Sequence, residues 1–339
     1  MNYDIAFYEV FAEEQERLVQ FLPDGYAYYF TENTIQEEDS STLLAPLISI
    51  RTQSIIPTGW ARFLDGIFTR STGYDHIHAY LTQTGLSLSC GYLPKYAATA
   101  VAEQTLMLML MLLRNANKQQ TSMETFSRNG LTGYELRQTC LAIIGVGNIG
   151  SEMARIGHGL GMQLLGVDLE PREQITAKYH LKYVSLSTAI QSADIISCHL
   201  SLTNFTAGML DYEVLSQAKS SAIFLNTARG EIAPPHDLIT LLREEKLSGI
   251  GLDVYDAESL VGSYLRGKIE VNSITSPEKR QSLEDTLSLL KHPRVIATPH
   301  NAFNTAESTS RKAQQTAENV AHFLSEQSFL TPVPPNPTE

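Results

Sequence analysis

The sequence predicts an α/β fold with parallel β-sheets, and three observations lead to this expectation. From about residue 140 onward, short runs rich in β-branched residues alternate with amphipathic segments of helical period. Such alternation is typical of right-handed β-α-β units, in which helices join parallel strands. The first hundred or so residues repeat the pattern less regularly, and the chain of 339 residues is long enough for two domains with separate cores.

The strand candidates are short apolar runs, separated by polar segments that read as helices or turns. In the first part of the chain we expect a helix at 12–22 and strands at 4–10, 26–30, 47–52, 66–71 and 86–90. In the later part we expect strands at 141–145, 163–168, 194–200, 222–227, 249–254 and 294–300, with helices at 151–161, 211–219 and 236–246.

Two further segments have a distinct composition. Residues 98–119 predict one long helix between the two halves, and its Met and Leu side chains favour a packing role, between domains or in a dimer, over a cofactor site. The tail at 331–339 is rich in proline and polar residues, which predicts disorder.

Composition excludes several classes of protein. A formal net charge of −12 argues against nucleic acid as a partner, because phosphate binding needs a basic surface. The amino terminus does not read as a signal peptide, and the most apolar segment, 106–114, is too short to span a membrane. The sparse cysteines Cys90, Cys140 and Cys198 lack metal-site spacing and suit a reducing cytoplasm, so we expect no metal site.

A glycine motif follows the predicted strand at 141–145. Gly145, Gly147 and Gly150 have the spacing G-x-G-x-x-G and come just before a predicted helix. The first glycine permits a tight turn, the second lets the backbone approach a pyrophosphate, and the third allows close packing of helix and sheet. The next predicted strand ends at Asp168, which can bind the ribose hydroxyls of NAD and would repel the extra phosphate of NADP. Arg172 lies nearby and would partly offset that repulsion.

Three polar residues follow predicted parallel strands, at the sheet edge where ligands bind in open α/β folds: Arg229, Glu258 and His300. Arginine binds a carboxylate through two parallel N–H donors. Histidine can donate or accept a proton near neutral pH, and a neighbouring carboxylate orients its ring. Together with a hydride donor, these groups are what reduction of a 2-oxo acid requires.

Each of these residues also has a structural interpretation. His300 could be a buried histidine bonded to the backbone, and Arg229 could form an ion pair with Glu231. Glu258 could be a solvated loop residue, with Asp256 as its competitor. Residue types and spacing alone leave both interpretations open.

An ordered set of motifs covers nearly the whole chain and resembles the NAD-dependent D-isomer-specific 2-hydroxyacid dehydrogenases, most closely the D-lactate dehydrogenases. The matching pieces are DIAFYEV, RSTGYDHI, LPKYAATAVAEQ, GVGNIG, ADIISCHLSLTNFT, NTARGE, GLDVYDAE and TPHNAF. The segment 259–293 is longer than expected and predicts an extra loop near the active site.

The resemblance implies a role for each matching residue. Arg229 corresponds to the substrate-binding arginine, His300 to the catalytic acid/base, and Glu258, rather than Asp256, to its carboxylate partner. Thr72 and Gly73 correspond to the backbone that holds the substrate carboxylate, and Tyr96 and Phe303 to aromatic pocket residues that suit a small apolar side chain. The implied cofactor contacts, beyond the glycines, are Asn148, Ile149, Asp168, Leu200, Ser201, Thr206, Thr227, Ala228 and Asp253.

The resemblance also implies two Rossmann-like domains with a cleft between them, one flavodoxin-like and catalytic, the other binding NAD. We assign residues 1–98 and 304–339 to the first and 99–303 to the second, and we expect a homodimer formed through the long helix.

The implied reaction is the NAD-dependent reduction of a pyruvate-like 2-oxo acid to the (R)-2-hydroxy acid, and its reverse. Two alternatives stay open: a corepressor-like protein of the same fold that senses NAD(H), and a dehydrogenase for glyoxylate, hydroxypyruvate or branched 2-oxo acids. Arg51 resembles an arginine of relatives that use phosphorylated or larger acids, and it could equally be structural.

Overall fold

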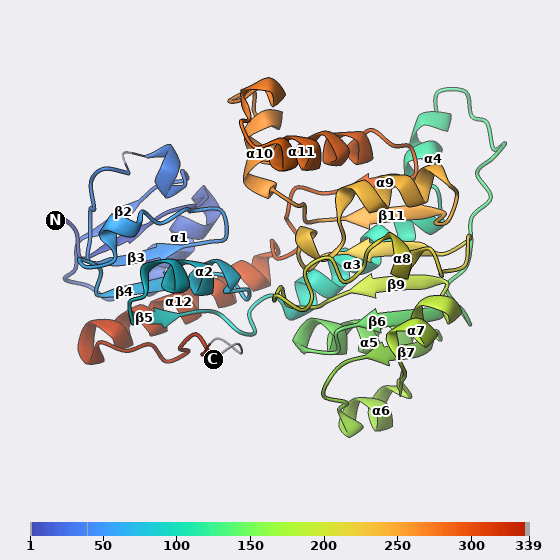
Figure 1. Ribbon diagram of the computed structural model, residues 1–339. Coiled ribbons are helices and arrows are strands. Elements are labelled where there is room, and N and C mark those ends of the chain that lie inside the picture. The colour runs from blue at the N-terminus through green and yellow to red at the C-terminus, as the bar shows by residue number, and fades with distance from the viewer. Residues whose placement is uncertain (1, 39, 336–339) are drawn as a thin grey trace. The chain divides into compact units, whose positions relative to one another are not determined.

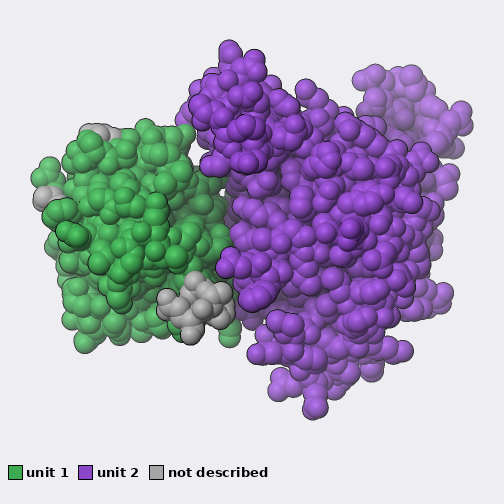
Figure 2. Space-filling view, in the orientation of Figure 1, with its two compact units in different colours: residues 1–97, 304–339 green, residues 98–303 purple. Residues whose placement is uncertain are grey.

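The computed structural model describes residues 2–38 and 40–335, which fall into two compact units (Figures 1 and 2). Unit 1 combines the chain up to Ala97 with the chain from Asn304 onward, and unit 2 runs from Ala98 to Phe303. Ala98 therefore belongs to unit 2, one residue before the boundary expected from the sequence. Both units contain a parallel sheet with helices, so the predicted α/β class is confirmed.

Unit 1 contains a five-stranded parallel sheet with the order β2-β1-β3-β4-β5. Its helices α1 and α12 pack against each other although they lie at opposite ends of the sequence (Figure 1). The strands β1, β3 and β4 are buried along their whole length, as expected for short apolar runs in a covered parallel sheet. The elements are β1 (Ile5–Phe7), α1 (Ala12–Phe21), β2 (Tyr28–Phe30), η1 (Ile35–Glu37), β3 (Leu47–Ile50), η2 (Thr58–Trp60), β4 (Gly66–Thr69), α2 (Asp75–Thr84), β5 (Ser89–Gly91) and α12 (Ala306–Glu326).

The start of the carboxyl-terminal tail is ordered, which corrects the prediction of disorder for this part. Pro332 forms an antiparallel bridge with Gly91 at the end of β5, and the Val333 amide donates to the Cys90 carbonyl at 2.8 Å. Proline lacks an amide donor, but its neighbours supply the bonds at this sheet edge. Residues 336–339 of the predicted tail lie outside the described part of the chain.

Unit 2 contains a seven-stranded parallel sheet with the order β12-β11-β10-β9-β6-β7-β8. Side chains of β6 alternate between two cores, with Leu141 and Ile143 in one and Ala142 and Ile144 in the other, so helices cover both faces. The strands are β6 (Cys140–Ile144), β7 (Gln163–Val167), β8 (Lys182–Tyr183), β9 (Ile195–Cys198), β10 (Ile223–Asn226), β11 (Gly249–Leu252) and β12 (Val295–Ala297). The helices are α3 (Ala98–Leu113), α4 (Ala116–Ser122), α5 (Asn148–Gly159), α6 (Glu173–Tyr179), α7 (Leu186–Ser192), α8 (Tyr212–Leu215), η3 (Gly230–Ile232), α9 (Pro235–Arg243), α10 (Glu258–Leu265), η4 (Val271–Ser273) and α11 (Pro277–Leu290).

The predicted single helix over 98–119 is wrong, because the chain forms two helices there. Helix α3 ends at Leu113, and Asn115 has a φ of 52°, in the left-handed region that asparagine tolerates. The Asn115 side-chain amide donates to the Thr132 carbonyl at 3.1 Å, and the Tyr134 amide donates to the Leu113 carbonyl at 3.0 Å. These bonds to the returning segment replace continuation of the helix. The expectation of a packing role holds for Leu108 and Met109, which are fully buried.

The expected extra loop over 259–293 is mostly helical. Helix α10 begins at Glu258, and helix α11 packs against α9 on one side of unit 2 (Figure 1). Ser276 caps α11 by accepting a hydrogen bond from the Lys279 amide, and Pro277 occupies the first helical position. Among the described residues, no helix combines the length and apolarity needed to cross a bilayer.

Candidate active site

The glycine motif forms the turn between β6 and α5. Gly145 has a φ of 93°, and a Cβ atom there would lie 2.8 Å from the His199 backbone. A Cβ atom at Gly150 would lie 2.0 Å from the Gly145 carbonyl oxygen, so helix and turn approach too closely for any side chain. A Cβ atom at Gly147 would meet no atom within 4 Å. The open position is therefore the second glycine, where the backbone can approach a pyrophosphate.

Asp168 follows β7 and lies beside this turn. Its carboxylate accepts hydrogen bonds from the Val146 amide at 2.7 Å and from the Glu170 amide at 3.0 Å. Helix α5 starts from Gly147, which has no side chain to cover the first amide groups of the helix. Uncovered helix amides bind phosphate, and a carboxylate at the end of the second strand binds ribose, so these residues fit NAD. Asn148 and Ile149, also predicted as cofactor contacts, are the first two residues of α5.

The loop after β9 is held by its own hydroxyl groups. The Thr206 hydroxyl donates to the Ser201 carbonyl at 2.7 Å and accepts from the Thr203 amide at 2.8 Å, while Leu200 is half-buried. His199, just before this loop, contacts the Ser197 hydroxyl at 2.8 Å. Burial lowers the pKa of His199 to about 4, so this histidine is neutral at pH 7 and is unsuited to supplying a proton there.

The loop that carries Arg229 is organised by Asn226 at the end of β10. The Asn226 side chain donates to the Arg229 carbonyl at 2.8 Å and accepts from the Ala228 amide at 3.0 Å. A Cβ atom at Gly230 would lie 1.9 Å from the Tyr255 carbonyl carbon, so the Arg229 loop touches the backbone that leads to Glu258. Sequence reasoning missed Asn226, although it begins the motif NTARGE.

His300 and Glu258 form a close pair. The His300 Nδ1 atom lies 2.7 and 2.8 Å from the two carboxylate oxygens of Glu258, and each side chain is about one-fifth exposed. Glu258 is the first residue of α10, where the positive end of the helix favours a negative charge. The carboxylate accepts the Nδ1 proton, which leaves Nε2 as the nitrogen that can exchange a proton with a substrate.

Asp253 supports the segment that contains His300. Its buried carboxylate accepts hydrogen bonds from the Asn301 amide at 2.9 Å, the Ala302 amide at 2.8 Å and the Thr298 hydroxyl. Burial raises the pKa of Asp253, and these donors oppose the rise. The geometry thus gives the Asp253 carboxylate a supporting role for the His300 segment, and the cofactor contact expected for Asp253 stays a prediction.

The two acidic residues that compete for the role beside His300 point to different partners. Asp256 accepts a hydrogen bond from the Ser282 hydroxyl of α11 at 2.5 Å, whereas Glu258 contacts His300. This arrangement agrees with the preference for Glu258 over Asp256.

Helix α3 contacts two of these loops, a connection that sequence reasoning missed. The Gln104 side chain donates to the Thr298 hydroxyl at 3.1 Å, and the Thr105 and Thr227 hydroxyls lie 2.9 Å apart. Thr227 and Ala228, both predicted cofactor contacts, lie directly after β10 and are buried. The available signal was the pair of polar residues at 104 and 105, directly before the Met- and Leu-rich part of the helix.

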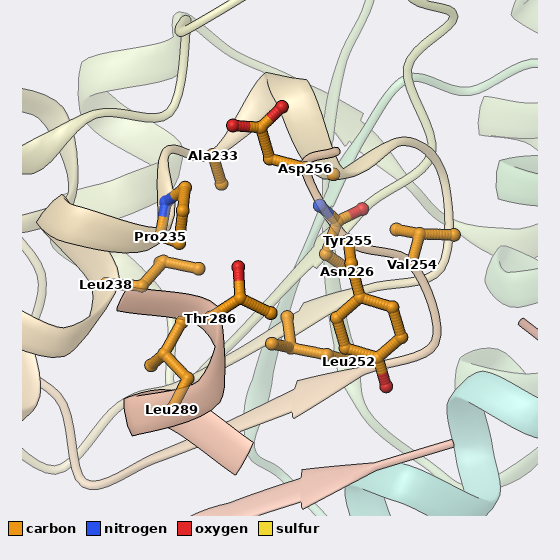
Figure 3. Close-up of a pocket in the computed structure, with 11 residues that line it drawn as sticks. Asn226, Ala233, Pro235, Leu238, Leu252, Val254, Tyr255, Asp256, Thr286 and Leu289 are labelled. Carbon is orange, nitrogen blue, oxygen red and sulfur yellow. The ribbon is translucent and has the colours of Figure 1, made fainter. Parts of the chain in front are cut away.

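A small pocket lies on the α9 and α11 side of unit 2 (Figure 3). Its lining is mostly apolar, with Leu238, Leu252 and Leu289 among its residues, and it does not include Arg229 or His300. The hydroxyl group of Thr286 points into this space, and it has no hydrogen-bond partner among the described residues. The pocket therefore borders the Arg229 loop, through Asn226 and Gly230, without containing Arg229 or His300.

The remaining predicted substrate contacts are divided between the units. Thr72 and Gly73 follow β4 in unit 1, where the Ser71 hydroxyl donates to the Gly73 carbonyl at 2.6 Å. Tyr96 also belongs to unit 1 and is 4% exposed, and Phe303 is the last residue of unit 2 and is 7% exposed. Within the described ranges, no group of His, Cys, Asp and Glu side chains could hold a metal ion.

Comparison with known proteins finds matches over most of the chain. The sequence model of the family "D-isomer specific 2-hydroxyacid dehydrogenase, NAD binding domain" matches residues 106–302. A D-lactate dehydrogenase of Treponema pallidum is 32% identical over 247 residues, covering 70% of this chain and 69% of the relative. An aromatic 2-oxoacid reductase of Clostridium sporogenes is 31% identical over 259 residues, covering 75% of this chain and 74% of the relative.

Among solved structures, the chain resembles the D-lactate dehydrogenase of Aquifex aeolicus in complex with NAD and lactic acid. The TM-score is 0.81 and the sequence identity 28%, with coverage of 96% of this chain and 99% of that one. The comparisons confirm NAD as the cofactor predicted from the glycine motif and Asp168.

Proposed function

Because the chain belongs to the family of D-isomer-specific 2-hydroxyacid dehydrogenases and is an NAD-dependent enzyme, we propose that it interconverts a small, pyruvate-like 2-oxo acid and its (R)-2-hydroxy acid. The observation that supports this most strongly is the contact of 2.7 Å between His300 and Glu258, in the same unit as Arg229. Relatives of comparable identity include enzymes named for lactate, and one similar structure holds lactic acid with NAD.

In the proposed mechanism, each polar side chain has one task. The Arg229 guanidinium binds the substrate carboxylate through paired N–H donors and so orients the neighbouring carbonyl group. NADH, when bound, supplies the hydride that reduces the carbonyl carbon. His300 donates the proton of Nε2 to the carbonyl oxygen, and Glu258 holds the ring and stabilises its charged form. In the reverse direction, the neutral His300 accepts the hydroxyl proton.

Further proposed roles, for residues of unit 1 and for Phe303 of unit 2, rest on the family resemblance. The backbone of Thr72 and Gly73 donates to the substrate carboxylate, and the rings of Tyr96 and Phe303 contact the substrate side chain. A second candidate substrate is an aromatic 2-oxo acid, because the C. sporogenes reductase named for such acids is as similar to this chain as the D-lactate dehydrogenase is.

The deciding experiment is steady-state oxidation of NADH by the purified protein with pyruvate, phenylpyruvate, glyoxylate, hydroxypyruvate and a branched 2-oxo acid. We expect the highest kcat/KM with pyruvate or a near relative. Preference for phenylpyruvate would replace the small-acid assignment with the aromatic one. NADH binding without turnover on any of these acids would overturn the proposal and favour an NAD(H)-sensing role.

NADPH serves as the matched cofactor control in the same assay. We expect a strong preference for NADH, because the Asp168 carboxylate would face the 2′-phosphate of NADPH. The variant Asp168→Ala should lower this preference. An NADH preference that is the same in the wild type and in Asp168→Ala would show that Asp168 does not select the cofactor.

We also propose that the protein forms a homodimer through α3 and the segment after it. Met107 and Leu110 of α3 are 39% and 40% exposed, and Met123, Phe126 and Tyr134 are each more than 60% exposed. Apolar side chains in such numbers on one segment favour a partner surface over water. Sedimentation analysis should give twice the mass of one chain, and Phe126→Glu should lower it toward the monomer. The cytoplasmic location stays a prediction.

A further inference from the structure

A cluster of buried charges lies in unit 1, outside the residues used in the proposed mechanism. Glu14 of α1, Arg70 after β4 and Lys312 of α12 are all completely buried. The Oε1 atom of Glu14 lies 2.9 Å from the Arg70 Nε atom and 2.7 Å from the Lys312 Nζ atom. Burying charges costs free energy even when they are paired, so a cluster of this kind needs a reason beyond stability.

Arg70 is well accounted for as a structural residue. Its guanidinium donates to Glu14, to the Ser49 hydroxyl at 3.0 Å and to the carbonyls of Tyr8 and Glu9 at 2.7 and 3.1 Å. These bonds join the carboxyl ends of β1 and β3 to the start of the loop that follows β4. Removal of Arg70 would therefore be expected to disrupt the sheet edge itself.

Lys312 is the second cation that contacts Glu14, beside Arg70. One carboxylate faces two cations, and the second oxygen of Glu14 has no hydrogen-bond partner within the described residues. Burial lowers the pKa of Lys312 to about 7, with Glu14 opposing the shift and Arg51 and Arg70 adding to it. Lys312 therefore changes its charge near neutral pH, which an ordinary lysine does not do.

The surroundings of Lys312 connect it to Tyr96. Its ammonium nitrogen lies over the rings of Phe11 and Tyr96, 5.8 and 6.0 Å from their centres, within the range of a cation–π interaction. The neighbouring turn of α12 holds the Tyr96 backbone. The Arg311 Nε atom donates to the Tyr96 carbonyl at 3.0 Å, and the Ser308 hydroxyl donates to the same carbonyl at 3.4 Å. Backbone and ring of Tyr96 are thus both in contact with one part of α12.

We propose that Lys312 is a positioning residue for Tyr96: its ammonium group, anchored by Glu14, fixes the ring in the place where it contacts the substrate side chain. This proposal rests on the role of Tyr96 in the proposed function. When Lys312 loses its proton, the attraction to the ring and to Glu14 is lost, and the ring is less well fixed. Substrate affinity then falls with rising pH, while NADH binding by unit 2 is unaffected.

The test measures KM, kcat and NADH affinity of the full-length enzyme for its best 2-oxo acid between about pH 6 and about pH 9. The variant Lys312→Met keeps the length of the side chain and leaves Glu14 with Arg70 as a neutral pair, so we expect it to fold. We expect KM to rise by about tenfold at pH 6, with kcat and NADH affinity within about threefold of the wild type. Lys312→Arg should restore most of the loss in KM.

The pH dependence of KM distinguishes a positioning role from a purely structural one, which would not change it. In the wild type, KM should increase as the pH rises through about 7, the pKa of Lys312, and in Lys312→Met this increase should be absent. The matched control is Lys95→Met, which removes an exposed lysine next to Tyr96 and should keep the wild-type profile.

Equal KM values and equal pH profiles for Lys312→Met and the wild type would overturn the inference. Should Lys312→Met fail to fold, a wild-type KM that does not change with pH would overturn it equally. A protein that turns over no 2-oxo acid would instead refute the proposed function, so the two failures are distinguishable.

Discussion

His300 is held from two sides by groups of different kinds. Glu258 contacts its Nδ1 atom, and the buried Asp253 carboxylate binds the backbone amides of Asn301 and Ala302 that follow it. His300 itself has a φ of 49°, an uncommon conformation that persists only where surrounding contacts enforce it. The side-chain orientation of His300 is therefore set by its neighbours and not by its local sequence.

Replacement of His300 by alanine should remove proton transfer and leave cofactor binding intact. We expect kcat to fall by about 10²–10⁴-fold, with NADH affinity within about twofold of the wild type, measured by steady-state kinetics and fluorescence titration. His158→Ala, on the exposed side of α5, is the control and should retain activity. Lost NADH binding in His300→Ala with unchanged turnover at saturation would contradict the assignment.

Arg229→Lys tests whether the guanidinium fork matters in addition to its charge. Lysine keeps the positive charge but has no planar pair of donors, so we expect kcat/KM to fall by about 10²-fold, mainly through KM. The exposed Arg243→Lys exchange in α9 should change neither constant. Wild-type kinetics of Arg229→Lys would rule out bidentate binding of the carboxylate.

At the scale of elements, the glycines in the turn from β6 into α5 serve two different purposes. One glycine is needed for packing, and the other leaves space for the cofactor. Gly150 is required for packing, because a Cβ atom there would collide with the Gly145 carbonyl, whereas Gly147 faces open space. The sequence predicts both glycines equally well, and only the packing of helix on strand tells which of them the fold itself needs.

Alanine at these two positions should therefore give different defects. We expect Gly150→Ala to lower the free energy of unfolding by about 1–3 kcal/mol, as overpacking does, measured by urea denaturation. We expect Gly147→Ala to change the free energy of unfolding by less than about 0.5 kcal/mol. This variant should instead weaken NADH binding, because its methyl group would occupy the space of the pyrophosphate. The reverse pattern of defects would be incompatible with these roles.

At the scale of the whole molecule, the buried cluster in unit 1 makes stability depend on pH. Burial raises the pKa of Glu14, but Lys312 and Arg70 lower it more, to about 2. The unfolded chain binds this proton near the ordinary value of 4.5, so the contribution of Glu14 is present above about pH 4.5 and is lost as the pH falls toward 2. Lys312 acts differently, because its folded pKa is lowered to about 7, and stability gains from this group as the pH rises from 7 toward 10.5.

Hydrogen exchange of the amides of β1 and β3, measured across this pH range, reports the stability of unit 1 and should show both trends. We expect a loss of up to a few kcal/mol below about pH 4.5 and a gain above about pH 7. In Lys312→Met the gain at alkaline pH should disappear, whereas Lys95→Met should behave like the wild type. If the gain in stability at alkaline pH persisted in Lys312→Met, it would have to come from other groups.

All strands except β8 could be predicted from the sequence, and so could helices α1, α3, α5, α8 and α9, because short β-branched runs and amphipathic segments report burial directly. Helices α2, α6, α7 and α12 were not predicted, and α10 and α11 lie in a segment expected to be a loop. The two-residue strand β8 was missed, since two residues carry no pattern, and the break at Asn115 was missed because it depends on bonds to residues 132 and 134. Asn226, Gln104 and the supporting role of Asp253 also escaped, because each acts through a partner distant in sequence.

The sequence by itself determined the α/β class, the glycine turn with Asp168, and the identity of the polar residues that follow the strands of unit 2. These features depend on local spacing and on residue chemistry, which the chain carries wherever it folds. Only the tertiary structure decided that Asn226 holds the Arg229 loop, and that Glu14, Arg70 and Lys312 share one buried site. Contacts between residues far apart in sequence depend on how elements pack, and packing is a property of the whole core.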